Sequence, residues 1–365
     1  MISKSQIKVF LVSFIAVFAM VALPNLGIKM PKFEFLQNGN LMQIISPLPK
    51  DFDIFDSLKP KLEQKPNTFE LKKPSSLVPQ VYAGLDFDQA TAYGVIDLDT
   101  GEVLASKNLD QKLPIASLTK LMSAVVALDL ATPNQLFTAG DQGTKMIPTK
   151  IVVKNGEKLT LEELLTASLL TSANDAIQVV ADNIDQTYNQ AVFVRAMNEK
   201  ARALKLTNSH FTNPQGFDDG HPYSSVADLA TLSGYALKNY PLISGIVAKE
   251  QAEFPQSNLH QYFYLNNWNG LMGVYPGVKG IKIGNTDDAG KTTMVVSGRQ
   301  GKTLLAVVLG APGLIERDLW TAQLLDLGFQ KSLNLDPVNV TQEQLKAKYK
   351  TWKYFNESCN CWATN

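Results

Sequence analysis

Strand patterns at both ends of the central region, with helical patterns between them, most constrain the fold of this 365-residue chain. Two β-prone runs, 92–97 and 102–105, flank an Asp99-Thr100-Gly101 turn and predict a β-hairpin. Further strands are predicted at 280–285, 292–297 and 303–309. We therefore expect an α+β domain over residues 85–331, whose first and last strands share one antiparallel sheet flanked by helices.

Apolar residues at helical spacing predict the elements between these strands. One helix should begin at or just before Ser117, since leucines, valines and a methionine recur on one face after it. Further helices are expected at 161–170, 175–184, 190–204 and 225–237, and a closing helix at 317–327. Ser225 and Asp228 form a cap pattern, and Gly328 is expected to end the closing helix.

The N-terminal segment carries Lys4 and Lys8 before a run without charge, Val9 to Leu23. With residues 24–28 included, the uncharged segment reaches about the 20 residues that a membrane-spanning helix needs. Because no clear cleavage site follows, we expect an uncleaved signal anchor over residues 1–28 rather than a removed signal peptide. The remainder would be extracytoplasmic and anchored to the cell membrane, or secreted or periplasmic if the segment is cleaved.

The segments before and after the predicted domain differ from it in composition. Residues 29–84 contain repeated prolines without sustained periodicity, which predicts a Pro-rich linker or stalk, although apolar patches such as Phe33 to Leu36 could pack on a surface. In the C-terminal tail, 332–365, apolar residues and lysines alternate between Thr341 and Phe355. This pattern fits a helix lying on a membrane, or a solvated helix or frayed tail.

Composition limits the possible partners. Lysine plus arginine and aspartate plus glutamate number 34 each, so no overall field attracts nucleic acid and no nucleic-acid partner is expected. Cys359 and Cys361 lie together near the C-terminus, where they cannot cross-link the main body. They are too few to bind a metal alone, and are incidental or pair between chains.

Three short motifs follow one another along this framework: Ser117-x-x-Lys120, Ser172-x-Asn174 and Lys282-x-Gly284. Each motif alone is common, and a helix cap or an edge-strand lysine would explain its residues without chemistry. Their order and their expected places, at a helix start, a helix join and a strand, favour one site. Together they supply a nucleophile, two amines and polar groups, as an acyl-serine mechanism requires.

The first motif explains how the nucleophile could be activated. Lys120 would lie one helical turn beyond Ser117 on the same face, so its amine can reach the hydroxyl. Burial and a second cation, for which Lys282 is the candidate, would lower the pKa of Lys120 so that it accepts a proton near neutral pH. The start of the helix adds backbone N–H groups where an oxyanion would form.

The three motifs together resemble the signature of penicillin-binding proteins and serine β-lactamases. The wider sequence is similar to the low-molecular-weight D-alanyl-D-alanine carboxypeptidases of serine peptidase family S11, in the passages 113–122, 169–176, 210–217, 223–230 and 277–286. The resemblance covers residues 85–331. It implies the β-lactamase and penicillin-binding-protein transpeptidase fold, an antiparallel sheet flanked by helices with a helical subdomain.

The resemblance also implies an activity and catalytic roles. The chain would trim peptidoglycan stem peptides that end in D-Ala-D-Ala, with β-lactam antibiotics as covalent inhibitors and with no metal or organic cofactor. Ser117 would be the acylated nucleophile and Lys120 its base, while Ser172 would pass the proton toward the leaving group. The backbone N–H groups of Ser117 and Asn285 would form the oxyanion hole.

Substrate-binding roles follow from the same resemblance. Asn174 would hold the peptide, Lys282 would attract the terminal carboxylate, and Gly284 would leave room for the ligand. One position departs from the family: Ile283 replaces a threonine or serine. The missing hydrogen bond to a carboxylate is worth roughly 1.5–3 kcal/mol, or about 10- to 150-fold in binding or turnover. Thr286 and Thr292 are candidates to take part of that role.

Other enzyme classes fit less well. The three histidines, His210, His221 and His260, do not begin a zinc-peptidase motif, and the chain has no Gly-x-Ser-x-Gly elbow. A β-lactamase would form the same acyl-serine, but the Glu-x-x-Leu-Asn motif of class A enzymes is missing between Asn174 and Lys282. A catalytically weak wall protein that binds or senses penicillin is the alternative of another kind, and Ile283 supports it.

Overall fold

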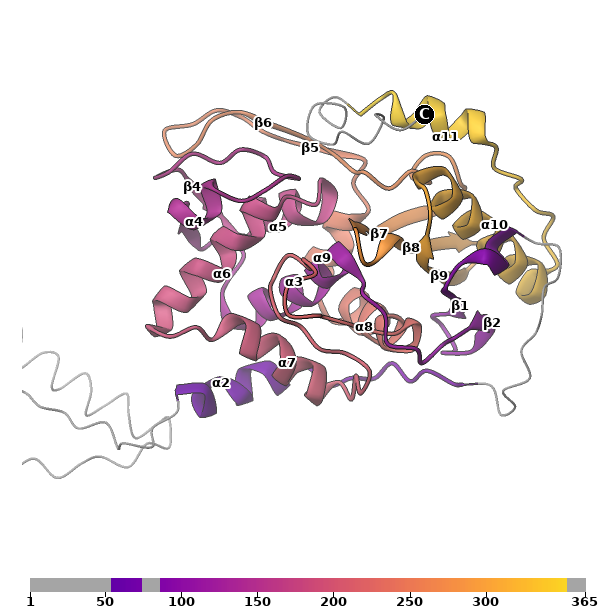
Figure 1. The fold of residues 1–365 in the computed structure, drawn as a ribbon, viewed down its shortest axis with the longest axis horizontal. Coiled ribbons are helices and arrows are strands. Elements are labelled where there is room, and N and C mark those ends of the chain that lie inside the picture. Colours follow the sequence, from indigo (N-terminus) through magenta and orange to yellow (C-terminus); the bar gives the residue numbers. More distant parts are fainter. Residues whose placement is uncertain (1–53, 74–85, 353–365) are drawn as a thin grey trace, which may run out of the picture. The chain divides into compact units, whose positions relative to one another are not determined.

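The computed structural model describes residues 54–73 and 86–352, and its centre is a five-stranded antiparallel sheet (Figure 1). The strand order is β2-β1-β9-β8-β7. The strands are β1 (Ala92–Asp97), β2 (Val103–Lys107), β7 (Val278–Thr286), β8 (Gly290–Arg299) and β9 (Lys302–Ala311). Because β1 pairs with β9 from Ala92↔Leu309 to Asp97↔Leu304, the predicted sharing of one sheet by the first and last strands is confirmed.

Helices pack on both faces of this sheet (Figure 1). They are α2 (Ile54–Glu63), α3 (Thr119–Leu130), α4 (Asp141–Thr144), α5 (Leu161–Leu170), α6 (Asn174–Tyr188), α7 (Phe193–Ala203), α8 (Val226–Asn239), α9 (Pro241–Val247), α10 (Leu314–Leu333) and α11 (Gln342–Tyr349). Short 3-10 helices are η2 (Asp86–Gln89) and η3 (Ala116–Leu118), and two-stranded sheets are formed by β3 (Leu136–Thr138) with β4 (Lys158–Thr160) and by β5 (Gln251–Phe254) with β6 (Phe263–Asn266).

Successive side chains along the strands point to opposite faces of the sheet and belong to two apolar cores. Along β9, Leu305 and Val307 join the core made with α3 and α5 to α8, whereas Leu304 and Val308 join the core made with α10 and α11. This alternation is the period of two that a strand buried on both faces requires. The sheet therefore separates a large helical part from a single long helix and its tail.

Local capping explains why several helices begin where the sequence predicts. At α5, Thr160 Oγ1 accepts from Glu163 N at 3.2 Å while Glu163 Oε2 accepts from Thr160 N at 2.8 Å, a complete capping box. At α8, Ser225 Oγ accepts from Asp228 N at 3.2 Å, as predicted. The helices at 161–170 and 225–237 are thus confirmed, apart from small shifts of their ends.

The closing helix is longer than predicted. Instead of ending at Gly328, α10 runs from Leu314 to Leu333 and ends at Asn334, which has a left-handed φ of +54°. Gly328 serves close packing: a Cβ there would lie 2.7 Å from Val95 Cγ2 and 2.8 Å from Leu304 Cδ1. The glycine therefore lets the helix approach the sheet and does not end it.

The described part of the predicted linker, residues 54–73, packs on the domain. In α2, Phe55, Leu58 and Leu62 are buried, since their spacing puts them on one helix face. Lys200 of α7 donates to the Leu62 carbonyl and lies 2.8 Å from Asp129 Oδ2. The signal segment at 1–28 and the two cysteines lie outside the described residues.

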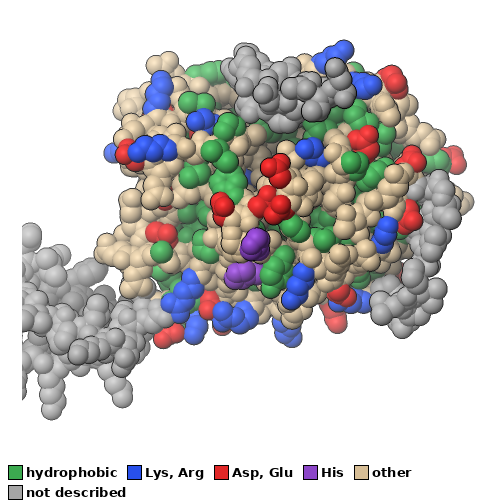
Figure 2. All heavy atoms as spheres, in the orientation of Figure 1, with side chains coloured by type: hydrophobic (Ala, Val, Ile, Leu, Met, Phe, Trp, Pro, Cys, Tyr) green, Lys and Arg blue, Asp and Glu red, His purple; other side chains and the backbone are tan. Residues whose placement is uncertain are grey.

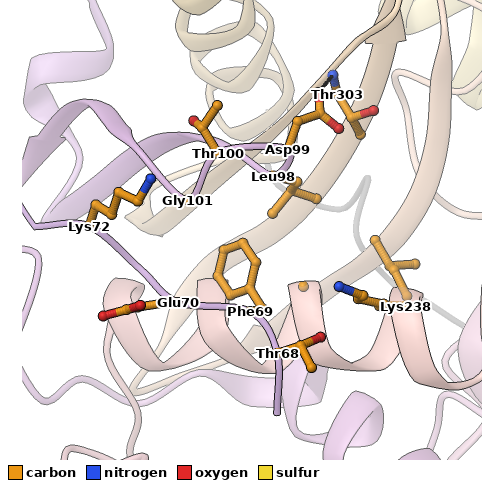
Figure 3. Close-up of a pocket in the computed structure, with 12 residues that line it drawn as sticks. Thr68, Phe69, Glu70, Lys72, Leu98, Asp99, Thr100, Gly101, Lys238 and Thr303 are labelled. Carbon is orange, nitrogen blue, oxygen red and sulfur yellow. Dashed lines mark hydrogen bonds between the residues drawn. The ribbon is translucent and has the colours of Figure 1, made fainter. Parts of the chain in front are cut away.

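A cavity of about 450 Å³ lies beside the rest of this segment (Figure 3). It is bounded by residues 68–72, by the turn between β1 and β2, and by the end of α8. Lys72 N donates to Gly101 O at 2.7 Å across it. None of its lining residues belongs to the three motifs.

The tail helix α11 packs on the domain through one face. A capping box of Thr341 and Gln344 starts it, and Leu345, Tyr349 and Trp352 are buried in the core formed with α10. These apolar side chains fill the core and are not available to a membrane, whereas the opposite face of the helix is exposed, as the alternative of a solvated surface helix predicts. Within the described ranges, no helix is both long and apolar enough to span a bilayer.

Charged side chains of both signs are interspersed over the face shown in Figure 2. That surface carries no continuous basic patch, in keeping with the equal numbers of acidic and basic residues in the chain.

Candidate active site

The first motif lies where η3 runs into α3. Lys120 is fully buried, and its Nζ lies 2.8 Å from Ser117 Oγ, 2.8 Å from Asn174 Oδ1 and 2.9 Å from Gln215 O. The amide and carbonyl oxygens can only accept, whereas the serine hydroxyl can also donate. A neutral amine, with two N–H groups and one lone pair, matches these three partners.

Electrostatics favour that neutral form. Burial lowers the pKa of Lys120 well below its usual value, and the positive charge of Lys282 lowers it further, against the opposing effect of Asp175. Burial also lowers the pKa of Lys282, to about 7, with help from Arg317. Burial and the charge of Lys282 thus both favour the neutral form of Lys120, in the direction that the sequence-based interpretation of these two amines expects.

The second motif forms the join between α5 and α6. Ser172 is buried and has a left-handed φ of +59°, a strained conformation for a residue with a Cβ. The segment 147–149 fixes this join, since Thr149 Oγ1 donates to Ser172 O at 2.8 Å and Asn174 N donates to Thr149 O at 2.7 Å. Asn174 Nδ2 donates to Ile147 O at 3.2 Å, which orients its Oδ1 toward Lys120.

The third motif lies on β7, an edge strand of the main sheet, directly beside η3. A Cβ on Gly284 would lie 3.0 Å from both Ile115 O and Ala116 Cβ, so only glycine permits this approach. Lys282 is buried, and its Nζ donates to Ile283 O at 2.9 Å. Asn285 is exposed and its Oδ1 accepts from Lys291 Nζ at 2.6 Å.

The departure at Ile283 has no replacement among the two threonines considered. Thr292 Oγ1 donates to Ile115 O at 3.1 Å, and Thr286 Oγ1 donates to Asp218 Oδ1 at 2.8 Å. Ile283 itself is 9% exposed and belongs to the apolar core with Leu271. The hydroxyl that the family pattern supplies is therefore not provided by Thr286 or Thr292 in this arrangement.

A loop that the motifs do not include completes the surroundings of Lys120. Gly216 has a φ of +87°, and a Cβ there would lie 1.9 Å from Ala116 O. Asn213 Oδ1 accepts from Gly216 N at 2.7 Å and from Phe217 N at 2.9 Å, which fixes the turn. In the sequence, residues 210–217 were noticed only for their similarity to the carboxypeptidase family. The group that contacts Lys120 there is a backbone carbonyl, which no side chain indicates.

Arg317, at the start of α10, is a second residue that sequence reasoning missed. Its side chain is fully buried, and Nε and Nη2 donate to the two carboxylate oxygens of Asp318 at 2.7 and 2.9 Å. Its Nη1 has no hydrogen-bond partner within the described residues. Burial alone would lower the pKa of Arg317, but Asp318 more than offsets this and the pKa is raised. The only sequence signal for Arg317 is its position as a charged residue in the first turn of a largely apolar helix.

The fold and the site define a class. A serine on a helix start, hydrogen-bonded to a buried lysine and placed beside an edge strand with a second lysine, is the arrangement of an acyl-serine enzyme. The fold is that of penicillin-binding proteins. A penicillin-binding protein homologue from Mycobacterium tuberculosis is 30% identical with a TM-score of 0.61, over 68% of this chain and 94% of that one.

Sequence comparison then gives the family. The model of Peptidase S11, D-alanyl-D-alanine carboxypeptidase, matches residues 83–313, and the chain belongs to this family of serine peptidases. D-alanyl-D-alanine carboxypeptidase DacF of Bacillus subtilis is 31% identical over 271 residues, 73% of this chain and 68% of the relative. DacB2 of M. tuberculosis is 34% identical over 247 residues, 66% of this chain and 82% of the relative.

Proposed function

We propose that the chain is a serine-type D-Ala-D-Ala carboxypeptidase that trims peptidoglycan stem peptides through an acyl-serine. The observation that carries this proposal is the 2.8 Å distance between Ser117 Oγ and the buried amine of Lys120. The other two partners of that amine are acceptors only, which supports a lone pair directed at the serine. Membership of the carboxypeptidase family supports the substrate class.

Acylation follows from these residues. Lys120 takes the proton from Ser117 Oγ as the oxygen attacks the carbonyl carbon of the penultimate D-alanine. The backbone N–H groups of Ser117 and Asn285 donate to the resulting oxyanion. Ser172 relays the proton to the amine of the terminal D-alanine as the peptide bond breaks. Water then attacks the acyl ester, Lys120 takes its proton, and Ser117 Oγ is reprotonated as it leaves.

Carboxylate recognition would select the end of the stem peptide. Lys282 supplies one buried positive charge, and Arg317 supplies another, with an Nη1 group that has no protein partner in the described part of the chain. A terminal carboxylate entering beside them would receive charge-assisted hydrogen bonds. Asn174 and the open edge of β7 at Gly284 would hold the backbone of the peptide.

Inhibition by β-lactams follows from the same chemistry, since these compounds carry a carboxylate beside an acylating amide. Penicillin-binding protein D2 of Listeria monocytogenes, solved in an ampicillin-bound form, is 28% identical with a TM-score of 0.58, over 66% of this chain and 97% of that one. Because the peptide substrate lies in the wall, the catalytic domain, 85–331, would act outside the cytoplasm. We retain membrane anchoring through residues 1–28, with residues 29–84 as a connection, as part of this proposal.

The decisive experiment measures D-alanine release and penicillin labelling on the same protein preparation. Wild-type protein should release D-alanine from a D-Ala-D-Ala pentapeptide and should be labelled by a fluorescent penicillin, whereas Ser117→Ala should do neither while melting at an unchanged temperature. Labelling without D-alanine release would favour the penicillin-sensing alternative. Rapid loss of the label would favour a β-lactamase.

A further inference from the structure

The tail helix α11 reaches the first turn of α10 through one side chain. Tyr349 is fully buried, and its hydroxyl lies 2.6 Å from Asp318 Oδ2 and 3.1 Å from Leu314 O. A tyrosine hydroxyl has one proton, and the carboxylate is the nearer and stronger acceptor. The tail helix, which lies beyond the matched family region of 83–313, thus donates a hydrogen bond to Asp318.

Asp318 in turn fixes the guanidinium of Arg317. Both carboxylate oxygens are used, at 2.7 Å from Nε and 2.9 Å from Nη2, so the two groups lie fork to fork. Such bidentate pairing sets the plane of the guanidinium as well as its position. Nη1 is left over, buried and without a hydrogen-bond partner within the described residues.

A glycine closes the other side of this arrangement. A Cβ on Gly270 would lie 2.0 Å from Asp318 Oδ2 and 2.7 Å from Tyr349 Cε1. The carboxylate is therefore held between the backbone at Gly270, the hydroxyl of Tyr349 and the guanidinium of Arg317. It has no room to turn away without moving at least one of them.

We propose that Tyr349 and Asp318 are positioning residues, which hold Arg317 so that its unpaired Nη1 faces the carboxylate of the substrate beside Lys282. The proposal rests on the proposed function, because it needs a substrate that ends in a carboxylate. Asp318 also places a negative charge directly against the buried guanidinium of Arg317, and this charge raises the pKa of Arg317. The C-terminal tail would then contribute to substrate recognition without touching the substrate.

The test compares two reactive thioester substrates, an acyl-D-alanyl-thioglycolate with a free carboxylate and its methyl ester. Tyr349→Phe removes one hydroxyl and should lower kcat/KM for the acid about 10-fold, mainly through KM, with the ester unaffected. Asp318→Asn should give a larger loss of the same kind. If these residues acted only on stability, the substitutions would lower kcat/KM for both substrates to the same extent, or for neither.

A matched control removes a similar bond elsewhere in the same core. Tyr275 donates to Asp326 Oδ1 at 2.8 Å, and Tyr275→Phe should leave the acid-to-ester ratio as in the wild type. Equal losses on both substrates, or an unchanged ratio in Tyr349→Phe, would overturn the positioning role alone. No turnover of either substrate by the wild type would overturn the proposed function and the positioning role with it. Thermal melting confirms that each variant is folded, and either variant alone suffices for the comparison.

Discussion

Lys120 and Lys282 are two fully buried amines, and the charge of a neighbouring cation lowers the pKa of each. The charge of Lys282 lowers the pKa of Lys120, while Arg317 lowers the pKa of Lys282. In the proposed mechanism, the neutral amine of Lys120 is the base and the charged amine of Lys282 attracts the carboxylate. Perturbed pKa values of this kind are typical of groups at functional sites.

The proposed roles of these two amines predict a bell-shaped pH profile of kcat/KM. Activity should rise with pH as Lys120 loses its proton, and should fall above about pH 7, where Lys282 loses the charge that attracts the carboxylate. In Arg317→Gln the pKa of Lys282 should rise, so the alkaline limb should move to higher pH although overall activity drops. Arg299→Gln serves as the control, and an alkaline limb at the same pH in all three proteins would contradict the assignment.

Removal of the base should slow acylation more than it harms folding. Lys120→Gln keeps the length of a polar side chain but cannot accept the serine proton, so labelling by a fluorescent penicillin should slow by about 10²- to 10⁴-fold. Ser123 is buried one turn further along α3 and donates to Pro214 O at 2.8 Å. Ser123→Ala should label at the wild-type rate, and similar slowing in both variants would argue against Lys120 as the base.

The isoleucine of the third motif offers an isosteric test. Ile283→Thr should raise D-alanine release by about 10-fold, because it restores a hydroxyl donor to the substrate carboxylate. The same change should lower the free energy of unfolding by about 1–2 kcal/mol, since Ile283 is buried in an apolar core.

Ile283→Val is the matched control, because valine has the shape of threonine without the hydroxyl. It should lose some stability without gaining activity. If threonine gives no more D-alanine than valine does, the missing hydroxyl is not what limits this enzyme.

The N-terminal helix should contribute strongly to stability. Phe55 is completely buried, with the guanidinium of Arg195 at 4.2 Å from the centroid of its ring. Phe55→Ala should lower the free energy of unfolding by about 3–5 kcal/mol in a urea titration. Glu63→Ala, at an exposed position of the same helix, should change it by less than about 0.5 kcal/mol. Equal, small effects would mean that α2 is only loosely attached.

Much of the fold was predictable because its signals are local. The period of two in the first and last strands, the Ser225 cap and the turn between Ser117 and Lys120 each depend on a few neighbouring residues. Gly328 was misjudged because a glycine that ends a helix and one that permits close packing look alike in sequence. Residues 54–63 were assigned to a linker on their prolines, although Phe55, Leu58 and Leu62 already carried helical spacing.

The parts of the site that could not be predicted depend on distant contacts. The carbonyl of Gln215 carries no side-chain signal at all, and its 2.9 Å bond to Lys120 spans 95 residues. Arg317 belongs to no motif, and its importance appears only when Asp318, Tyr349 and Gly270 are seen around it. Sequence therefore indicated the groups that we propose to react, whereas the groups that contact and orient them became visible only in the structure.

The buried faces of α2 and α11 lie outside the region, 83–313, that carries the family pattern. The region that matches the family, 83–313, is thus shorter than the region whose side chains form the two cores, 54–352. A fragment cut at the family boundaries would expose both apolar cores to water and would be prone to proteolysis, whereas one spanning 54–352 keeps both cores intact. The boundaries of the family match therefore differ from the boundaries of the unit that buries its own apolar side chains. An isolated domain for experiments should span residues 54–352.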